Sequence, residues 1–451
     1  MAVTERIAEF VVATRCDTVP REALAVAKTA FLDCLGVALA GSKEDSAKIC
    51  GAIARLESGA EQAAVLGQGF KSSALHAAFA NGTAAHALDY DHSFALMGQP
   101  TAPIIPAVMS LGDALGASGA AALEAYVCGF EVTGKLALAL RESTQDWHAP
   151  GTLGSIGATA ACAKLLGLDA RKIALALGMA SSMASGVPAN FGTMTKPLHV
   201  GLAARNGVLA AELAQVGYTA NARALEAKGG FFDTFYAVEP QEDGPLGELG
   251  FKYALVHPGI KIKPYPCGGL THTAIDAVLD MRARHGITGS AVESIEVLVP
   301  EHTYKRIAFK VPETGLQGKF SMGYILARAL IDGRVGLEAF TDAAVRDRKV
   351  LELAEKVSMA RDPAMDFGGD GSRPAKVTIR LKNGASFSRH VVHPKGSAES
   401  PLSEQELTAK FVECARRALE EPAIGQVIES VKRFETLGDI RPLCEFLIGE
   451  R

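Results

Sequence analysis

The sequence is poor in tryptophan and contains no closely paired cysteines. Among 451 residues there is a single tryptophan, Trp147, and the eight cysteines are scattered without a C-x-x-C pair. A zinc site or a cysteine-ligated iron–sulfur cluster is therefore not expected. The first residues lack the basic-then-apolar pattern of a signal peptide, and no uncharged apolar run reaches the roughly 20 residues of a membrane helix. We expect a cytoplasmic protein without a membrane partner.

A strong excess of charge of either sign is also missing. The net charge is -4, and charged residues make up 21% of the chain. No cluster of lysine and arginine forms the basic stripe that binds phosphate backbones, so a nucleic-acid partner is not expected. A small anionic substrate is compatible with this composition, because a few cations inside a pocket suffice to bind it.

Alanine and glycine are abundant, and hydrophobic residues make up 48% of the chain. From residue 5 to about 255 the sequence indicates helices, because apolar positions recur at the three-to-four spacing of a buried helical face. Glycine and proline separate these stretches as helix stops. The clearest of them span residues 22–35, 74–88, 104–115, 119–140, 155–167, 171–183 and 201–216.

The pattern changes after Pro258. Residues 294–300 and 375–381 alternate apolar and polar side chains, as half-buried strands do, and Asn383-Gly384 is typical of a hairpin turn. Helical runs lie between the strands, and a capping box at Ser403 predicts a return to helix. We predict a mainly α fold: a large all-helical domain over residues 1–258 plus 396–451, with an inserted smaller α+β domain over residues 259–395.

Four polar segments stand out in this apolar background. In the first, Asp89-Tyr90-Asp91-His92 follows an apolar helix. Carboxylates and an imidazole this close could bind a metal, act as acid and base, or cap neighbouring helices. We expect no metal, because D-x-D-H alone has no third-ligand pattern around it.

The second segment places His148 before a Gly/Ser/Thr turn that opens an alanine-rich helix. Free N–H groups at such a helix start attract carboxylates, and His148 could move a proton near neutral pH. A loop histidine stacked on Trp147 is the alternative interpretation.

In the third segment, Lys196 stands among small and apolar neighbours. This setting indicates a partly desolvated amine that binds a carboxylate or has a lowered pKa. We assign His199 and Arg205, which follow it, to the domain interior or to an interface.

The fourth segment, residues 261–276, has two prolines that stiffen the chain and two glycines that permit unusual backbone angles. Lys263 and the start of a helix near Thr271 together predict an anion pocket. Cys267 lacks a Cys-His-Asn framework, so we do not expect it to be a nucleophile.

These four segments, in this order, resemble the MmgE/PrpD family, which includes 2-methylcitrate dehydratases, cis-aconitate decarboxylases and an iminodisuccinate epimerase. The resemblance covers nearly the whole chain, from Phe31 to the helical tail. It implies a lid-like smaller domain, a homodimer, a site between the domains, and no metal or organic cofactor.

The same resemblance implies the site residues. From the sequence alone, Tyr324 would pass for a helix-face aromatic in the core; its match to a pocket tyrosine of the decarboxylases adds it to the set. The predicted catalytic residues are Asp91, His148, Lys196, Lys263 and Tyr324. The predicted substrate-binding residues are Gln99, Thr152, Gly268 and His272.

Two positions depart from the decarboxylases. Gln99 stands where they have a histidine before proline, and Gly268 stands where they have a histidine after the Pro-Cys pair. Two imidazoles are therefore missing at the matching positions, and His92 and His272 are the candidates to replace them.

All three family reactions pass through a carbanion or an enolate-like state beside a carboxylate, which Lys196 and Lys263 would stabilise in a water-poor pocket. Dehydration also needs an acid for the departing hydroxide, and the two missing histidines weaken that role most. We expect a cofactor-independent lyase acting on a small di- or tricarboxylic acid, with decarboxylation of an aconitate-like acid ahead of dehydration of the 2-methylcitrate type. Epimerisation of an iminodisuccinate-like acid is a further alternative, and a non-catalytic carboxylate-binding scaffold is the alternative outside the enzymes.

Overall fold

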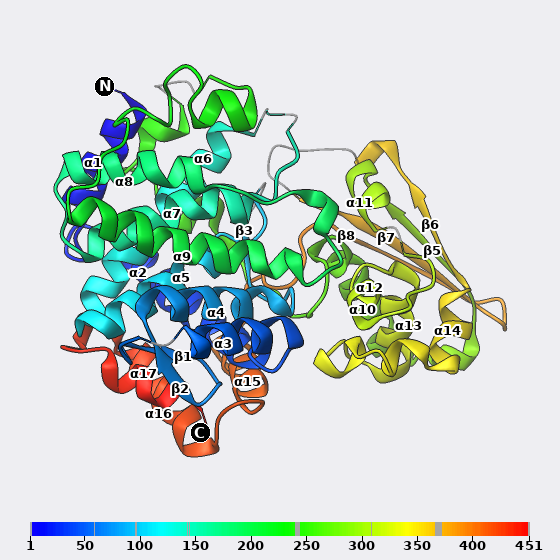
Figure 1. The fold of residues 1–451 in the computed structure, drawn as a ribbon. Helices are drawn as coiled ribbons and strands as arrows, with labels where there is room; N and C mark the ends of the chain where they lie inside the picture. Colours follow the sequence, from blue (N-terminus) through cyan, green and yellow to red (C-terminus); the bar gives the residue numbers. More distant parts are fainter. Residues whose placement is uncertain are drawn as a thin grey trace. The chain divides into compact units, whose positions relative to one another are not determined.

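The computed structural model describes residues 2–57, 59–94, 97–141, 143, 145–239, 244–307, 309–365 and 372–449. The chain divides into two compact units (Figure 1). The helical unit consists of Met1–Ile260 together with Ser403–Arg451, and the mixed unit is Lys261–Leu402. The predicted limits of the inserted domain were 259 and 395. Helices dominate the chain, which confirms the mainly α fold class.

The helical unit begins with helices that follow one another through short connections. These are α1 (Val3–Ala13), α2 (Arg21–Gly41), α3 (Asp45–Leu56), α4 (Ala74–Ala87), α5 (Thr101–Leu115), α6 (Gly119–Ala139), α7 (Ala149–Leu165), α8 (Ala170–Met183) and α9 (Thr195–Gln215). Two short strands, β1 (Ala63–Val65) and β2 (Phe70–Ser72), pair antiparallel. The remaining short strands are β3 (Ser93–Phe94) and β4 (Ile260–Lys261).

Small residues let α4 and α9 approach closely. A Cβ added to Gly82 would lie 3.0 Å from the Cα of Gly201, and one added to Gly201 would lie 2.1 Å from Thr83 Oγ1. Such contacts leave no room for a side chain at either position. The last turn of α4 carries His86 and the first turns of α9 carry Lys196 and His199, so this packing positions these residues of the candidate site.

One described helix, α2, is long and apolar enough by composition to span a membrane. It nevertheless contains Lys28 and Asp33, and 72% of its most apolar window is buried in the fold. Its buried side chains include Phe31, Leu35 and Leu39, which belong to the core of the helical unit.

The C-terminal segment returns to the helical unit as α15 (Glu404–Ala415), α16 (Glu421–Lys432) and α17 (Arg441–Leu447). The predicted capping box at Ser403 is confirmed: Glu406 N–H donates to Ser403 Oγ at 3.2 Å, and Ser403 N–H donates to the Glu406 carboxylate at 3.0 Å. Helix α15 packs on α2 and sends the buried side chain of Lys410 toward it.

The mixed unit contains a four-stranded sheet in the order β6-β5-β7-β8, in which β5 and β6 are parallel and the other pairs are antiparallel. Its elements are α10 (His272–His285), β5 (Val292–Val299), α11 (Glu301–Arg306), α12 (Gly315–Gly318), α13 (Met322–Asp332), α14 (Arg348–Ala354), β6 (Val357–Arg361), β7 (Ala375–Leu381) and β8 (Ser386–Val391). The two predicted strands and the Asn383-Gly384 hairpin are confirmed. The sequence missed β6, which lies between the two predicted strands, where only helical runs were predicted.

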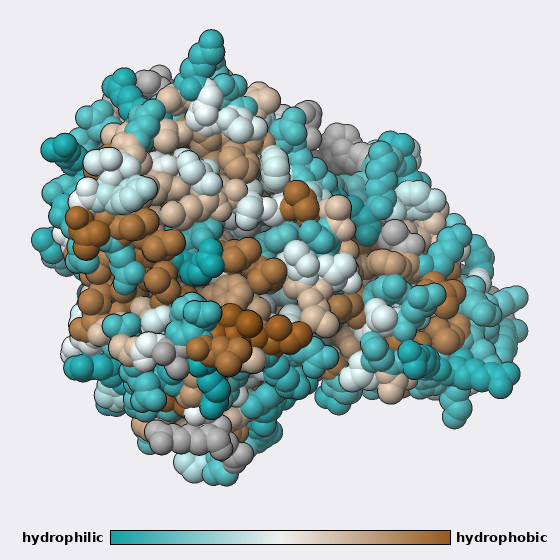
Figure 2. Space-filling view, in the orientation of Figure 1, coloured by the Kyte–Doolittle hydropathy of each residue, from teal (hydrophilic) through white to brown (hydrophobic). Residues whose placement is uncertain are grey.

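Apolar side chains also gather on the surface of the helical unit where α3 lies (Figure 2). On α3 they are Ile49, Ile53 and Leu56, all exposed and spaced along one face of the helix.

Candidate active site

A buried histidine and a buried aspartate form a pair at the end of α4. His86 lies in the last turn of α4, and its Nδ1 lies 2.9 Å from Asp91 Oδ2. Both side chains are almost completely excluded from solvent. Among the described residues, no hydrogen-bond partner reaches Nε2 of His86. Sequence reasoning assigned a site role to Asp91 but none to His86.

Asp89, two residues before Asp91, faces a different set of partners. Its backbone adopts the left-handed region, with φ of 52°, which turns the chain sharply after α4. The Lys196 ammonium lies 3.0 Å from Asp89 Oδ1, and Gln99 Nε2 donates to the same oxygen at 3.4 Å. The structure thus brings the predicted residues Lys196 and Gln99 together, through an aspartate that was not predicted.

His148 caps the start of α7 and lies against other rings of the site. Its ring centre is 5.4 Å from His86, 5.2 Å from His199 and 5.1 Å from Phe191. Stacking on Trp147, the alternative interpretation, is wrong. The indole packs on Phe235 and donates to its carbonyl oxygen at 2.7 Å.

Helix α7 begins at Ala149, several residues earlier than predicted. The amide groups of Gly151 and Thr152 therefore lie inside its first turn and donate to the carbonyl oxygen of His148. The Thr152 hydroxyl pairs with the Tyr236 hydroxyl at 2.7 Å. The predicted substrate-binding residue Thr152 is thus engaged within the helical unit.

His199 belongs to the site, although the sequence assigned it to the interior or an interface. Its Nδ1 lies 3.1 Å from Nδ1 of His148, so one ring donates and the other accepts. A Cβ on Gly186 would meet the Cβ of His148 at 3.2 Å, and one on Gly151 would meet the Cβ of His199 at 3.3 Å. These close glycine contacts exist only in the folded chain, so no local sequence signal indicates the pairing.

Burial controls the charge of the three imidazoles. It lowers the pKa of His86, against the opposing effect of Asp91. Burial also holds the pKa of His148 well below its usual range, with His86, Lys196 and His199 adding to the effect, and it lowers the pKa of His199. The three rings are therefore neutral near pH 7.

A second buried network holds the segment that carries the carboxylates. Asp33 on α2 accepts from the Lys410 ammonium at 2.6 Å and pairs with His92 Nδ1 at 2.8 Å. Lys410 also donates to the carbonyl oxygen of Tyr90 at 2.9 Å and lies 3.9 Å from the centre of its ring. The segment 89–92 is therefore held at Tyr90 by Lys410 and at His92 by Asp33.

This network removes His92 from the list of substitutes for the missing imidazoles. Its Nδ1 faces Asp33, and its Nε2 lies 2.6 Å from the Thr101 hydroxyl, which continues to Tyr126. Both ring nitrogens are thus used inside the core.

The spacing of His86, Asp89 and Asp91 would admit a cation, since one ligand atom of each lies within 4.8 Å of the others. Asp89, however, already pairs with the Lys196 ammonium at 3.0 Å. A metal ion would have to displace that ammonium, so these residues do not fit a metal centre well.

In the mixed unit, Lys263, Cys267 and His272 are all buried. His272 Nε2 lies 3.3 Å from the carbonyl oxygen of Cys267, and its ring packs on Tyr265. A Cβ on Gly268 would lie 3.1 Å from the Phe320 ring. A side chain at this position would therefore meet the Phe320 ring.

Tyr324 lies in the core of the mixed unit and is completely buried. Its hydroxyl donates to the carbonyl oxygen of Ala339 and accepts from Arg328 Nε at 3.0 Å. The structure gives this side chain the core position that the sequence pattern alone indicated, and its predicted catalytic role stays a prediction.

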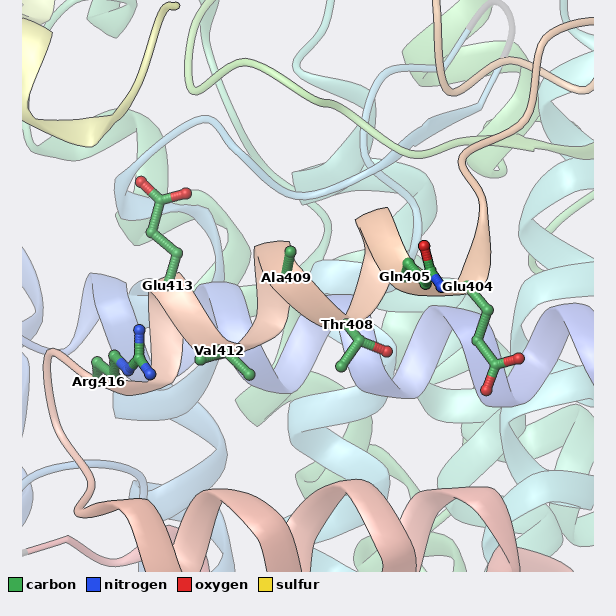
Figure 3. Close-up of a pocket in the computed structure, with 7 residues that line it drawn as sticks. All are labelled: Glu404, Gln405, Thr408, Ala409, Val412, Glu413 and Arg416. Atoms are coloured by element: carbon green, nitrogen blue, oxygen red, sulfur yellow. The ribbon is translucent and has the colours of Figure 1, made fainter.

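A shallow hollow of about 640 Å³ runs along the outer face of α15 (Figure 3). Six residues of this helix and Arg416, which follows it, line the hollow, and none of them is a predicted site residue. It is separate from the histidine cluster described above.

Known proteins are similar to this chain, some of them over nearly its whole length. Residues 5–242 match the MmgE/PrpD N-terminal domain, and residues 265–433 match the MmgE/PrpD C-terminal domain. Cis-aconitate decarboxylase of Homo sapiens is 28% identical over 99% of this chain and 95% of its own length. The enzyme of the same name from Aspergillus terreus is 29% identical over 99% of this chain and 96% of its own length. The 2-methylcitrate dehydratase of Salmonella typhimurium is 26% identical over 54% of this chain and 53% of its own length.

Proposed function

The chain belongs to the MmgE/PrpD family and is an enzyme of that family, and we propose that it decarboxylates an aconitate-like tricarboxylic acid without a cofactor. The extent of similarity supports this choice of reaction. Alignment with the decarboxylases covers 99% of the chain, whereas alignment with the dehydratase covers 54%. Dehydration of a 2-methylcitrate-like acid is accordingly the second candidate.

The observation that carries the proposal is the pairing of Lys196 with Asp89 beside buried imidazoles. A lysine held by a carboxylate, which also accepts from a glutamine, can exchange that carboxylate for one of the substrate. Because little water reaches the site, its positive charge acts strongly on a neighbouring anion. Decarboxylation leaves an electron pair on carbon, and an ammonium beside a conjugated carboxylate stabilises that charge.

His148 contributes a neutral ring with an open nitrogen, since no partner of its Nε2 lies within the described part of the chain. A neutral imidazole can hydrogen-bond a substrate carboxylate without the repulsion that a second cation would exert on Lys196. The arrangement suits a substrate with several carboxylates, each needing its own donor.

A product assay tests the proposal. Incubated with cis-aconitate, the protein should release carbon dioxide and form a five-carbon unsaturated dicarboxylate, observed by proton NMR. 2-Methylcitrate, trans-aconitate and iminodisuccinate are incubated in parallel. Water loss from 2-methylcitrate without turnover of cis-aconitate would establish the dehydratase, and isomerisation of iminodisuccinate alone would establish the epimerase.

Substituting Lys196 tests the role of its charge. Lys196→Met should lower kcat/KM for cis-aconitate by about 100-fold or more, the usual loss when one donor to a developing anion is removed. Lys48→Met is the matched control, because this lysine is exposed on α3 with a distant partner, Asp45, at 3.9 Å. Equal losses in the two variants would contradict the assignment.

The residues of the mixed unit, the oligomeric state and the location belong to the same proposal. Lys263, Gly268 and His272 belong to the mixed unit, and their action on a substrate is an inference from the family resemblance. A homodimer and a cytoplasmic location are proposed on the same basis.

A further inference from the structure

We propose that His86 is the proton donor of the reaction: it takes up a proton on Nε2 when the tricarboxylate binds and delivers it to the carbanion that the loss of carbon dioxide leaves, while Asp91 stabilises the charged ring. The inference rests on the proposed function and deepens it by naming the residue that supplies the proton.

The open nitrogen of His86 is the first observation. A buried polar atom without a hydrogen bond costs free energy, so proteins seldom leave one unpaired. Nε2 of His86 is nevertheless without a partner among the residues that the structure describes, although Nδ1 is held by Asp91 at 2.9 Å. A ligand group or a transferred proton would satisfy this nitrogen.

A second histidine–aspartate pair in the same unit provides a comparison. His92 and Asp33 are equally buried, and their contact of 2.8 Å matches that of His86 and Asp91. In that pair, however, Nε2 contacts the Thr101 hydroxyl at 2.6 Å. A histidine that serves only to hold the fold has both nitrogens occupied, and His86 departs from this arrangement.

His148 also has an open Nε2 but lacks the carboxylate. Its Nδ1 faces another imidazole, that of His199, at 3.1 Å. A positive charge on His148 would therefore have no anion behind it, whereas a charge on His86 would lie against Asp91. An aspartate on Nδ1 stabilises an imidazolium in this way in catalytic triads. His86 is thus the better proton carrier of the two.

The charges around the ring explain when it would take up a proton. The titratable and charged groups around His86 are Asp91, Asp89 and Lys196, together with the rings of His148 and His199, and burial together with Lys196 keeps the free ring neutral. Carboxylates that bind at Lys196 bring negative charge beside the ring and raise its pKa, so a proton enters from solvent.

The proton transfer accounts for each bond broken and formed. The bond between carbon and the departing carboxylate breaks, and its electron pair stays on carbon. A carbon that carries this negative charge in the conjugated acid then takes the proton from Nε2, and His86 returns to its neutral form. One proton is consumed for each carbon dioxide released.

Proton uptake and turnover together test the inference. Propane-1,2,3-tricarboxylate, a saturated acid that cannot react in this way, is bound by calorimetry in two buffers of different ionisation enthalpy. The wild type should take up a proton. His86→Asn keeps an amide donor for Asp91 but has no Nε2, so it should lose the uptake, and kcat on cis-aconitate should fall about 100-fold or more with KM little changed.

His76→Asn is the matched control. His76 lies on the same helix, and its Nδ1 contacts the Ser73 hydroxyl at 3.0 Å, away from the histidine cluster. This variant should keep both the proton uptake and the rate. If His86→Asn fails to fold, Asp91→Asn replaces it. Without its carboxylate the ring should take up less proton, and the pH profile of kcat should move to lower pH.

Failures of the two proposals are distinguishable. A wild type that does not decarboxylate cis-aconitate overturns the proposed function. The measurement of proton uptake then tests the role of His86 independently of turnover. A His86→Asn variant that still takes up the proton, or whose kcat stays within about tenfold of an active wild type, overturns the inference alone.

Discussion

Tyr324 combines two hydrogen bonds with complete burial, and this combination predicts a loss of stability if its hydroxyl is removed. Tyr324→Phe would leave the Ala339 carbonyl oxygen and Arg328 Nε without their partner. Unsatisfied buried groups cost about 1–3 kcal/mol each, so we expect the free energy of unfolding, measured with urea, to fall by at least that amount.

Tyr304→Phe serves as the control, because Tyr304 is exposed on α11. This substitution should change the free energy of unfolding by no more than about 0.5 kcal/mol. Unchanged stability in Tyr324→Phe, together with a large loss of kcat, would instead favour the catalytic role implied by the family resemblance.

At the residue scale the sequence identified Asp91, His148 and Lys196, and the structure brings their segments together. It missed His86 and His199, because single histidines in alanine-rich helices are also typical of a core. What distinguishes them is the side chain opposite each ring, and that depends on how α4, α7 and α9 pack. The local sequence does not contain this information.

At the scale of helices, the contact between α4 and α9 determines where Lys196 and His199 lie relative to His86. Gly201→Ala would place a methyl group 2.1 Å from Thr83 Oγ1 and 2.5 Å from the carbonyl oxygen of Phe79. The helices would have to separate, which costs about 1–3 kcal/mol. We expect a lower free energy of unfolding together with reduced turnover.

Gly425→Ala is the matched control for this prediction. Gly425 lies in α16 with no atom near an added Cβ. Replacing a helical glycine there should raise stability by about 0.5–1 kcal/mol. If both substitutions stabilise the protein, the close approach of α4 and α9 does not control its stability.

Helix positions were predictable where apolar spacing and capping residues agreed, as at α4, α6 and α15. The starts of α7 and α9 were placed too late, because glycine, proline and threonine at 150–155 and 195–197 are typical of turns. Proline is equally compatible with the first turn of a helix. Thr152 and Lys196, which we expected in loops, therefore lie in helices.

At the scale of the whole chain, Asp33 and Lys410 join segments that are 377 positions apart. Burial alone would raise the pKa of Asp33, but Lys410 and His92 together lower it to about 2 from an ordinary value of 3.8. A lowered folded-state pKa adds stability above pH 3.8, and this stability is lost as the pH falls through about 2. Acid should therefore weaken the fold in this window.

Asp33→Asn should remove this part of the acid dependence, measured as urea unfolding between pH 6 and pH 2. Lys410→Met should be more damaging, since it leaves a buried carboxylate without its cation, at a cost of about 3–5 kcal/mol. Lys432→Met, at an exposed pair with Glu429, is the control and should cost less than about 1 kcal/mol. If the loss of stability at low pH persists unchanged in Asp33→Asn, other carboxylates cause it.

The position of Lys410 also has a consequence for the order of events at the ribosome. Asp33, His92 and Tyr90 are synthesised early, but the ammonium that fixes them is made only after the complete inserted unit, Lys261–Leu402. At roughly 5–20 residues per second, Asp33 therefore lacks its lysine partner for on the order of tens of seconds after it is made. The contacts that hold Asp33 and Tyr90 are thus completed late in synthesis, when the intervening polypeptide already exists.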